Sequence, residues 1–179
     1  DSYGSRGLGD VYKRQNYDSF IDVAKQFDYI FTSDSGQIPK YIDECGHDNV
    51  YSLPFAAQPI IHNPIRNNLP SHDVGFAGSW YIREHGNRKR DTKLLLDAAS
   101  SHGLHIFDRF YGTDNRNKFP EEYNDFIKGS LSYKETCMAY RVYKIFLNVN
   151  SVSDSPTMFS RRVFEAVSYT HLRAHETRN

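Results

Sequence analysis

Apolar residues recur along the chain with two alternating spacings, one typical of helices and one typical of short buried strands. The stretch 18–27 has helical spacing and is followed by a short strand over 28–32. A second helix is predicted over 38–45, with Gly46 as its C-terminal cap, and a second strand over 49–53. Because strand, helix and strand follow in this order, we expect the two strands to be parallel.

The same alternation resumes after a stretch rich in proline, asparagine and histidine that shows no clear period. The predicted elements are a strand over 73–79, a helix over 87–103 capped by Gly103, a strand over 103–107, a long polar loop over 113–128, a helix over 132–142 and a strand over 144–150. The last strand leads through a polar loop into a helix that begins near Arg162. This order predicts an α/β fold built on parallel, Rossmann-like sheets.

The proline-rich stretch 58–72 lies between the two alternating regions, and we interpret it as a linker between two domains. The domain before it would cover residues 16–57, and the domain after it would cover residues 73–166. An ordinary surface loop would explain the prolines equally well. The order of the motifs on either side favours the linker.

The two ends of the chain are related to each other at the level of DNA. Residues 10–15 can be encoded by GAT GTG TAT AAG AGA CAG, and the complementary strand, read in a shifted frame, encodes residues 167–172. Such a relation is typical of a transposon-end sequencing adapter; coincidence or a genuine basic tail is the alternative. We therefore expect residues 1–15 and 167–179 to be adapter-derived, not native, and to pack poorly. The native part would then be a fragment.

Composition narrows the possible partners. The 22 Lys and Arg residues balance the 22 Asp and Glu residues, which argues against a nucleic-acid-binding surface. No apolar run approaches the roughly 20 residues that a transmembrane helix needs. Cys45 and Cys137 are isolated, which suits a reducing compartment or simple burial. We expect a cytoplasmic protein without a transmembrane segment.

The residues with the most distinctive chemistry follow the last predicted strand. Arg161, Arg162 and Glu165 come where a strand passes through a loop into a helix, the place at which open α/β sheets bind ligands. Arginine offers a fixed fork of donors to phosphate, and a carboxylate one turn into a helix can accept from both hydroxyls of a ribose. The alternative is a surface helix in which Arg161 and Glu165 form a solvated i,i+4 pair.

The segment Arg162-Val-Phe-Glu165-Ala resembles the Arg-x-Phe-Glu-Ala segment of the spore maturation protein CgeB-like glycosyltransferases, a branch of the GT-B superfamily. Three further segments are similar to that family: Phe76-Ala-Gly78-Ser79, Tyr111-Gly112 and Leu147-Asn148-Val-Asn150. The resemblance implies that residues 16–57 are the end of an acceptor domain. Residues 73–166 would be most of the nucleotide-sugar-binding domain.

The resemblance implies transfer of a hexosyl group from a nucleotide sugar, UDP- or GDP-linked, to a hydroxyl of a glycan, protein or surface polymer. Arg162 and Arg90 would be catalytic by offsetting charge on the diphosphate, and Glu165 would hold the ribose. No metal or other cofactor is implied, and the fragment itself is expected to be inactive. The implied donor-binding residues are Gly78, Ser79, Tyr111, Gly112, Asn148, Asn150, Ser160, Arg161, Arg162 and Glu165.

Many retaining GT-B transferases carry two glutamates eight positions apart; Glu165 matches the second, but Thr157 stands at the position of the first, which the CgeB-like branch often lacks. The stereochemical outcome and the catalytic base therefore stay open. A non-catalytic Rossmann-like module that binds a sugar nucleotide or a protein is the main alternative. A response-regulator-like domain is disfavoured because no acidic cluster follows a first strand. A metal site is disfavoured because the ligands His102 and His105 would diverge.

Overall fold

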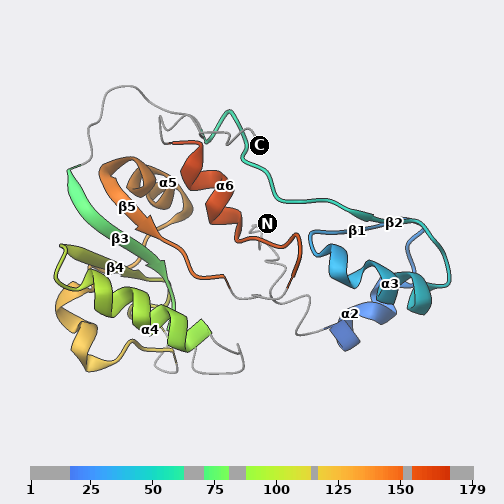
Figure 1. Cartoon of the computed structure of the whole chain (residues 1–179), viewed down its shortest axis with the longest axis horizontal. Helices are drawn as coiled ribbons and strands as arrows, with labels where there is room; N and C mark the ends of the chain where they lie inside the picture. The colour runs from blue at the N-terminus through green and yellow to red at the C-terminus, as the bar shows by residue number, and fades with distance from the viewer. Residues whose placement is uncertain (1–16, 63–70, 81–87, 114–116, 151–154, 170–179) are drawn as a thin grey trace, which may run out of the picture. The chain divides into compact units, whose positions relative to one another are not determined.

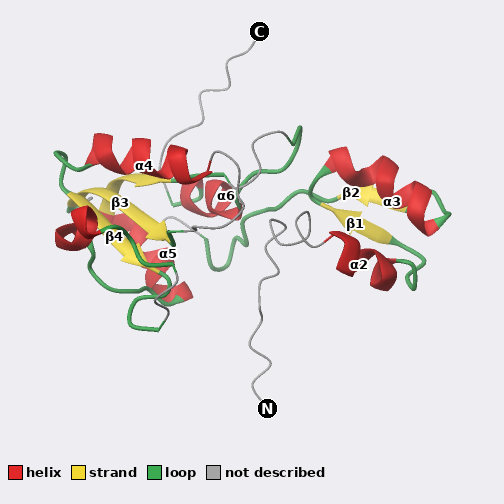
Figure 2. Cartoon of the chain, turned by 90° about the horizontal axis from the view of Figure 1, so that it is seen from below, coloured by secondary structure: helices red, strands yellow, loops and turns green. Residues whose placement is uncertain are grey.

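The computed structural model of the chain describes residues 17–62, 71–80, 88–113, 117–150 and 155–169. Within these residues the fold is α/β, with small parallel sheets and helices (Figures 1 and 2). The chain divides into two compact units. The first comprises Asp1–Phe55 and Val152–Phe159, and the second comprises Ala56–Ser151 and Ser160–Asn179.

The first unit is built on two short parallel strands, β1 (Ile30–Thr32) and β2 (Val50–Ser52). The turn η1 (Ser35–Gln37) and the helix α3 (Ile38–Cys45) connect them, and α2 (Tyr17–Ala24) precedes them. Gly46 adopts a left-handed φ of 71° and its N–H bonds to Ile42 O, which confirms the predicted cap of α3. The predicted parallel pairing is also confirmed.

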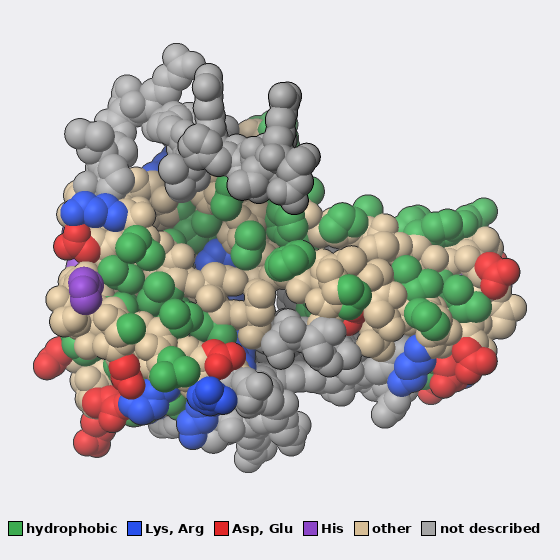
Figure 3. Space-filling model, viewed as in Figure 1, with side chains coloured by type: hydrophobic (Ala, Val, Ile, Leu, Met, Phe, Trp, Pro, Cys, Tyr) green, Lys and Arg blue, Asp and Glu red, His purple; other side chains and the backbone are tan. Residues whose placement is uncertain are grey.

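One face of the β1–β2 pair is packed and the other is not. Ile30 and Val50 join residues of α2 and α3 in a single apolar core. The next residue of each strand points to the opposite face, where the rings of Phe31 and Tyr51 lie 5.8 Å apart and stay exposed. Apolar side chains are visible over this part of the first unit in Figure 3. Only one face of this pair therefore contributes to a core.

The second unit contains a three-stranded parallel sheet in the order β4-β3-β5. Its strands are β3 (His72–Gly78), β4 (Leu104–Asp108) and β5 (Tyr143–Leu147). Gly78 pairs with Asp108, and Phe76 pairs with Leu147. All three strands therefore end at one edge of the sheet, and Ser79, Arg109 and Asn148 follow them directly there.

Helices cover both faces of this sheet, with α4 (Arg88–Ala99) on one side and α5 (Tyr133–Val142) on the other (Figure 2). Residues 74–77 of β3 are consecutively buried, as expected for a central strand of a parallel sheet. A Cβ at Gly75 would lie 2.8 Å from the ring of Phe146 and 2.9 Å from that of Tyr143. Glycine is required there because both rings lie against the backbone of β3.

The core on the α4 side is large and aromatic. Its buried members are Val74, Phe76, Trp80, Leu96, Ala99, Leu104, Ile106, Phe119, Tyr123 and Val149. On the α5 side a smaller cluster joins Cys137, Tyr140 and Tyr169 to Phe146 and Ala166. Ser132 caps α5 through a reciprocal pair of hydrogen bonds with Glu135. None of the described helices is long and apolar enough to span a bilayer.

Two expectations about local structure were wrong. The stretch 113–128 is not a structureless loop, because it contains η2 (Glu121–Phe126), and Phe119 and Tyr123 are core residues. Helix α4 ends at Ala99, so Gly103, with φ of 68°, belongs to the turn before β4.

The flanks expected to pack poorly, 1–15 and 167–179, lie outside the described residues except for 167–169. Of these, Val167 is exposed, whereas Tyr169 is buried and its hydroxyl donates to Ile61 O at 2.8 Å.

Candidate functional site

The polar residues that follow β3 and β5 lie at the edge of the sheet where the strands end. Ser79 comes directly after β3 and is 2% exposed, yet its Oγ has no hydrogen-bond partner among the described residues. Asn148 comes directly after β5, and its Oδ1 is likewise buried without a described partner. Leaving such an atom unpaired costs about 1–3 kcal/mol. Two buried polar atoms without described partners therefore lie at neighbouring strand ends.

Asn150 connects the end of β5 to the start of α6 (Arg161–Val167). Its Oδ1 accepts hydrogen bonds from Asn148 Nδ2 and from Ser160 N, both at 3.1 Å. Ser160 occupies the N-cap of α6, but its own side chain makes no capping bond. The structure thus brings together three of the residues that the sequence assigned to the donor site, Asn148, Asn150 and Ser160. Residues 151–154 of the same connection lie outside the described part.

The residues at the ends of β3 and β4 are held at the same edge by the backbone. Gly78 O accepts a 2.8 Å hydrogen bond from Arg109 N. Asp108 is buried, and its Oδ1 accepts from Phe110 N at 3.0 Å. Tyr111 is exposed, and Gly112 turns the chain with φ of 74°. Tyr111 and Gly112 therefore follow β4 at this edge, although no described contact joins them to the asparagines.

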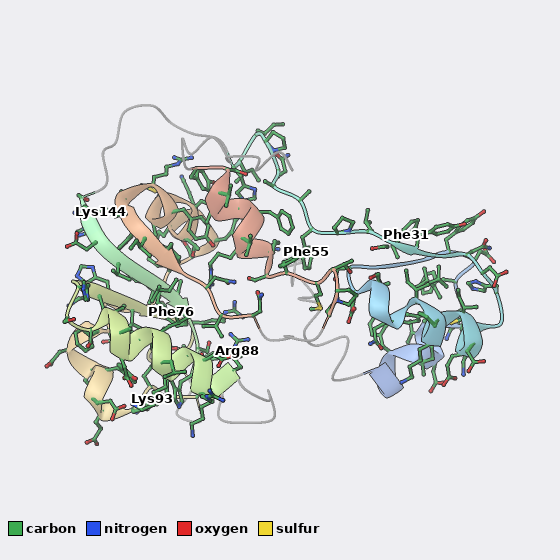
Figure 4. All side chains as sticks on the ribbon, in the orientation of Figure 1. Phe31, Phe55, Phe76, Arg88, Lys93 and Lys144 are labelled. Carbon is green, nitrogen blue, oxygen red and sulfur yellow. The ribbon has the colours of Figure 1, made fainter. Side chains whose placement is uncertain are left out.

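The two arginines assigned to catalysis are not brought together by any described contact. Arg162 Nε donates to Tyr140 Oη at 3.3 Å, and its guanidinium lies 5.8 Å from the ring centroid of Phe146. Arg90 is exposed in the first turn of α4, which begins at the residue Arg88 labelled in Figure 4. Lys144, labelled in the same figure, lies at the opposite edge of the sheet and pairs with Asp73. The contacts of Arg162 with Tyr140 and Phe146 hold its side chain against α5 and β5.

Glu165 is buried, with 4% of its surface exposed. Its Oε1 lies 2.7 Å from Arg161 Nε and 3.7 Å from His62 Nε2. The surface-helix interpretation predicted an i,i+4 pair between Arg161 and Glu165, and this pair is present. It also predicted that the pair is solvated, which is wrong for Glu165 because the carboxylate faces the interior of the second unit. A buried carboxylate needs such partners to keep its charge.

His62 is a site residue that the sequence did not indicate. It is buried, its Nδ1 accepts from Gln58 N at 2.8 Å, and its Nε2 lies 2.7 Å from Tyr133 Oη. The ring of Tyr169 meets it edge-on at 5.8 Å. His62 lies in the aperiodic stretch interpreted as a linker, where hydrophobic periodicity gives no information on burial.

Thr157 belongs to a separate polar cluster in the first unit. Its Oγ1 donates to Ser33 O and accepts from Ser35 N, both at 2.9 Å. Ser155 Oγ donates to Asp34 Oδ1 at 2.6 Å. The side chain of Thr157 is therefore engaged with the loop that follows β1.

Among the described residues, no three His, Cys, Asp or Glu side chains are grouped in a way that could hold a metal ion. No protein-family model, no curated protein and no solved structure matches the chain.

Proposed function

We propose that the second unit is the nucleotide-sugar-binding part of a GT-B glycosyltransferase. The observation that carries the proposal is the pair of buried polar atoms without described partners, Ser79 Oγ and Asn148 Oδ1, at neighbouring strand ends of a parallel sheet. Open α/β sheets bind their ligands at this edge. The similarity of Arg162-Val-Phe-Glu165-Ala to the CgeB-like glycosyltransferases supports the choice of a nucleotide sugar.

In this proposal the donor is a UDP- or GDP-linked hexose, and the hexosyl group passes to an acceptor hydroxyl. Asn148 Oδ1 accepts from a donor group of the nucleotide sugar, while the Ser79 hydroxyl can donate or accept. Arg162, with Arg90, offsets the charge that grows on the diphosphate as the glycosidic bond breaks. Glu165 accepts from the ribose, and its carboxylate is held by Arg161 Nε at 2.7 Å. The proposed reaction is metal-independent.

A non-catalytic module that binds a sugar nucleotide is the second candidate, and one observation favours it. Glu165 and Arg162 both have partners inside the second unit, namely Arg161 and Tyr140. Side chains that are already paired gain less from a ligand, because each new contact replaces an existing one. Such a module would bind the nucleotide sugar without releasing its diphosphate.

Calorimetric titration of the 179-residue chain with UDP and GDP tests the proposed binding. At least one of the two should bind, and Asn148→Ala should weaken that binding by about tenfold, because it removes the buried acceptor. Asn124→Ala is the matched control, since Asn124 is exposed on η2 in the same unit. Equal affinity in Asn148→Ala and Asn124→Ala would contradict the proposed site. Release of diphosphate from a UDP- or GDP-hexose by the chain would contradict the binding module.

A further inference from the structure

Residues 58–62 form a compact turn that is organised by Gln58. The side-chain Oε1 of Gln58 accepts from Ile60 N at 2.5 Å and from Ile61 N at 3.3 Å, and its main-chain O accepts from His62 N at 2.7 Å. The N–H of Gln58 donates to Nδ1 of His62. The turn therefore holds His62 both through its main-chain N–H and through its imidazole ring.

The hydrogen bond from Gln58 determines which ring nitrogen of His62 carries the proton. Because Nδ1 accepts from a backbone N–H, it has no hydrogen, and the neutral ring must carry its hydrogen on Nε2. Nε2 faces Tyr133 Oη at 2.7 Å and Glu165 Oε1 at 3.7 Å. The imidazole thus donates to Tyr133 on α5, while Glu165 Oε1 lies beyond hydrogen-bond distance.

Few titratable or charged side chains of the described residues contact His62 or Glu165. They are Tyr133 on α5, Arg161 and Glu165 on α6, and Tyr169 after α6, and of these only Glu165 is a carboxyl group. Burial and the neighbouring Glu165 raise the pKa of Tyr133 to about 12, so its phenol stays neutral. Arg161 Nε is the cation closest to the Glu165 carboxylate.

We propose that His62 is a positioning residue for Glu165 and makes nucleotide binding at this site dependent on pH. The inference rests on the proposed function, because it takes Glu165 as the group that holds the ribose. Neutral His62 secures the turn through Gln58 and leaves the carboxylate to Arg161 and the ligand. Protonated His62 carries hydrogens on both nitrogens, so it loses the bond from Gln58 N–H and gains a charge attraction to Glu165.

Protonation of His62 should therefore draw Glu165 Oε1 toward the imidazolium and away from a bound ribose. The affinity for UDP or GDP should fall by about fivefold or more between about pH 8 and pH 5, the range in which histidines titrate. His62→Gln keeps an amide donor but cannot titrate, so its affinity should change less over that range. His102→Gln is the control, since it removes an exposed histidine of the same unit.

Two measurements on 15N-labelled protein test the inference without any nucleotide. The 15N shifts of the neutral His62 ring should show a hydrogen on Nε2 and none on Nδ1, and Glu165→Gln should change the Nε2 shift because an amide replaces the carboxylate 3.7 Å away. A proton on Nδ1, or an unchanged Nε2 shift in Glu165→Gln, would overturn the positioning role. If the chain binds neither UDP nor GDP, the proposed function fails, whereas these spectra still decide the coupling. If the affinity of His62→Gln for UDP or GDP fell with pH as steeply as that of the unaltered chain, the role of His62 in the pH dependence would also be overturned.

Discussion

Ser155 Oγ donates a 2.6 Å hydrogen bond to Asp34 Oδ1, although the two residues are 121 positions apart in the sequence. Asp34 is buried in the loop after β1, and its Oδ1 also accepts from Gly36 N at 3.1 Å. Thr157 bonds two backbone groups of the same loop. The segment 155–159 is therefore part of the first unit, although both ends of the β5–α6 connection belong to the second.

Thr157→Val removes the hydroxyl that bonds Ser33 O and Ser35 N, and it keeps the shape of the side chain. We expect the first unit to lose about 1–3 kcal/mol, because two backbone groups are left without this partner. Hydrogen exchange of the Ser35 amide measures the loss locally. Thr113→Val is the control, since its hydroxyl lies in the second unit and the bond described for it goes to Phe110 O. Unchanged exchange at Ser35 would show that Thr157 does not stabilise the loop.

Gly75→Ala places a methyl group 2.8 Å from the ring of Phe146. Overpacking of this kind costs about 1–3 kcal/mol. Gly46→Ala is also strained, by a φ of 71°, but meets open space. Combining each change with Phe146→Leu should therefore partly rescue Gly75→Ala and leave Gly46→Ala unrescued, as measured by denaturant unfolding. If Phe146→Leu changed the free energy of unfolding equally in both backgrounds, crowding between residue 75 and Phe146 would be refuted.

Tyr123→Phe tests the η2 region that the sequence did not predict. The phenol donates a 2.6 Å hydrogen bond to Asp97, and burial together with this bond raises the pKa of Tyr123 to about 12. Removing the hydroxyl should cost about 0.5–1.5 kcal/mol, whereas Tyr123→Ala should cost about 3–5 kcal/mol because it empties part of the aromatic core. Thermal melts compare the two. Similar small losses would place Tyr123 in a surface loop after all.

His105 should make the second unit sensitive to mild acid. Burial, Lys128 and His72 lower the pKa of His105 in the folded chain, so the unfolded chain binds the proton first as the pH falls. The stability that the neutral form of His105 supports is therefore present above about pH 6.5. The free energy of unfolding then decreases as the pH falls toward the folded-state pKa of His105. Urea unfolding between pH 8 and pH 5 should show a shallower decline in His105→Gln. A steeper decline in that variant would reverse the assigned sign.

Much of the fold could be predicted because local signals and tertiary packing agree. The helical spacing around Tyr41 and the cap at Gly46 define α3, and the apolar run before Asn148 defines β5. The stretch around Tyr123 was missed because its core residues, Phe119 and Tyr123, lie in an irregular segment with a short 3-10 helix, whose spacing matches neither period.

The candidate site was only partly predictable for a similar reason. Asn148 and Ser160 follow an apolar strand and precede a helix, which local pattern can identify. Glu165 lies beside His62, which is about one hundred positions earlier in an aperiodic stretch. The engagement of Thr157 with Ser33 is equally remote. Sequence spacing carries no information about such pairings.

The most direct test of the account is amide NMR of the 179-residue chain during titration with UDP and with GDP. A nucleotide at the proposed site should shift the amide signals of Ser79, Asn148, Asn150 and Ser160 together, with a common saturation curve. Signals of Asp73 and Lys144, at the opposite edge of the sheet, should stay in place. Shifts confined to that opposite edge, or no shifts at millimolar UDP and GDP, would contradict a nucleotide-binding role for this unit.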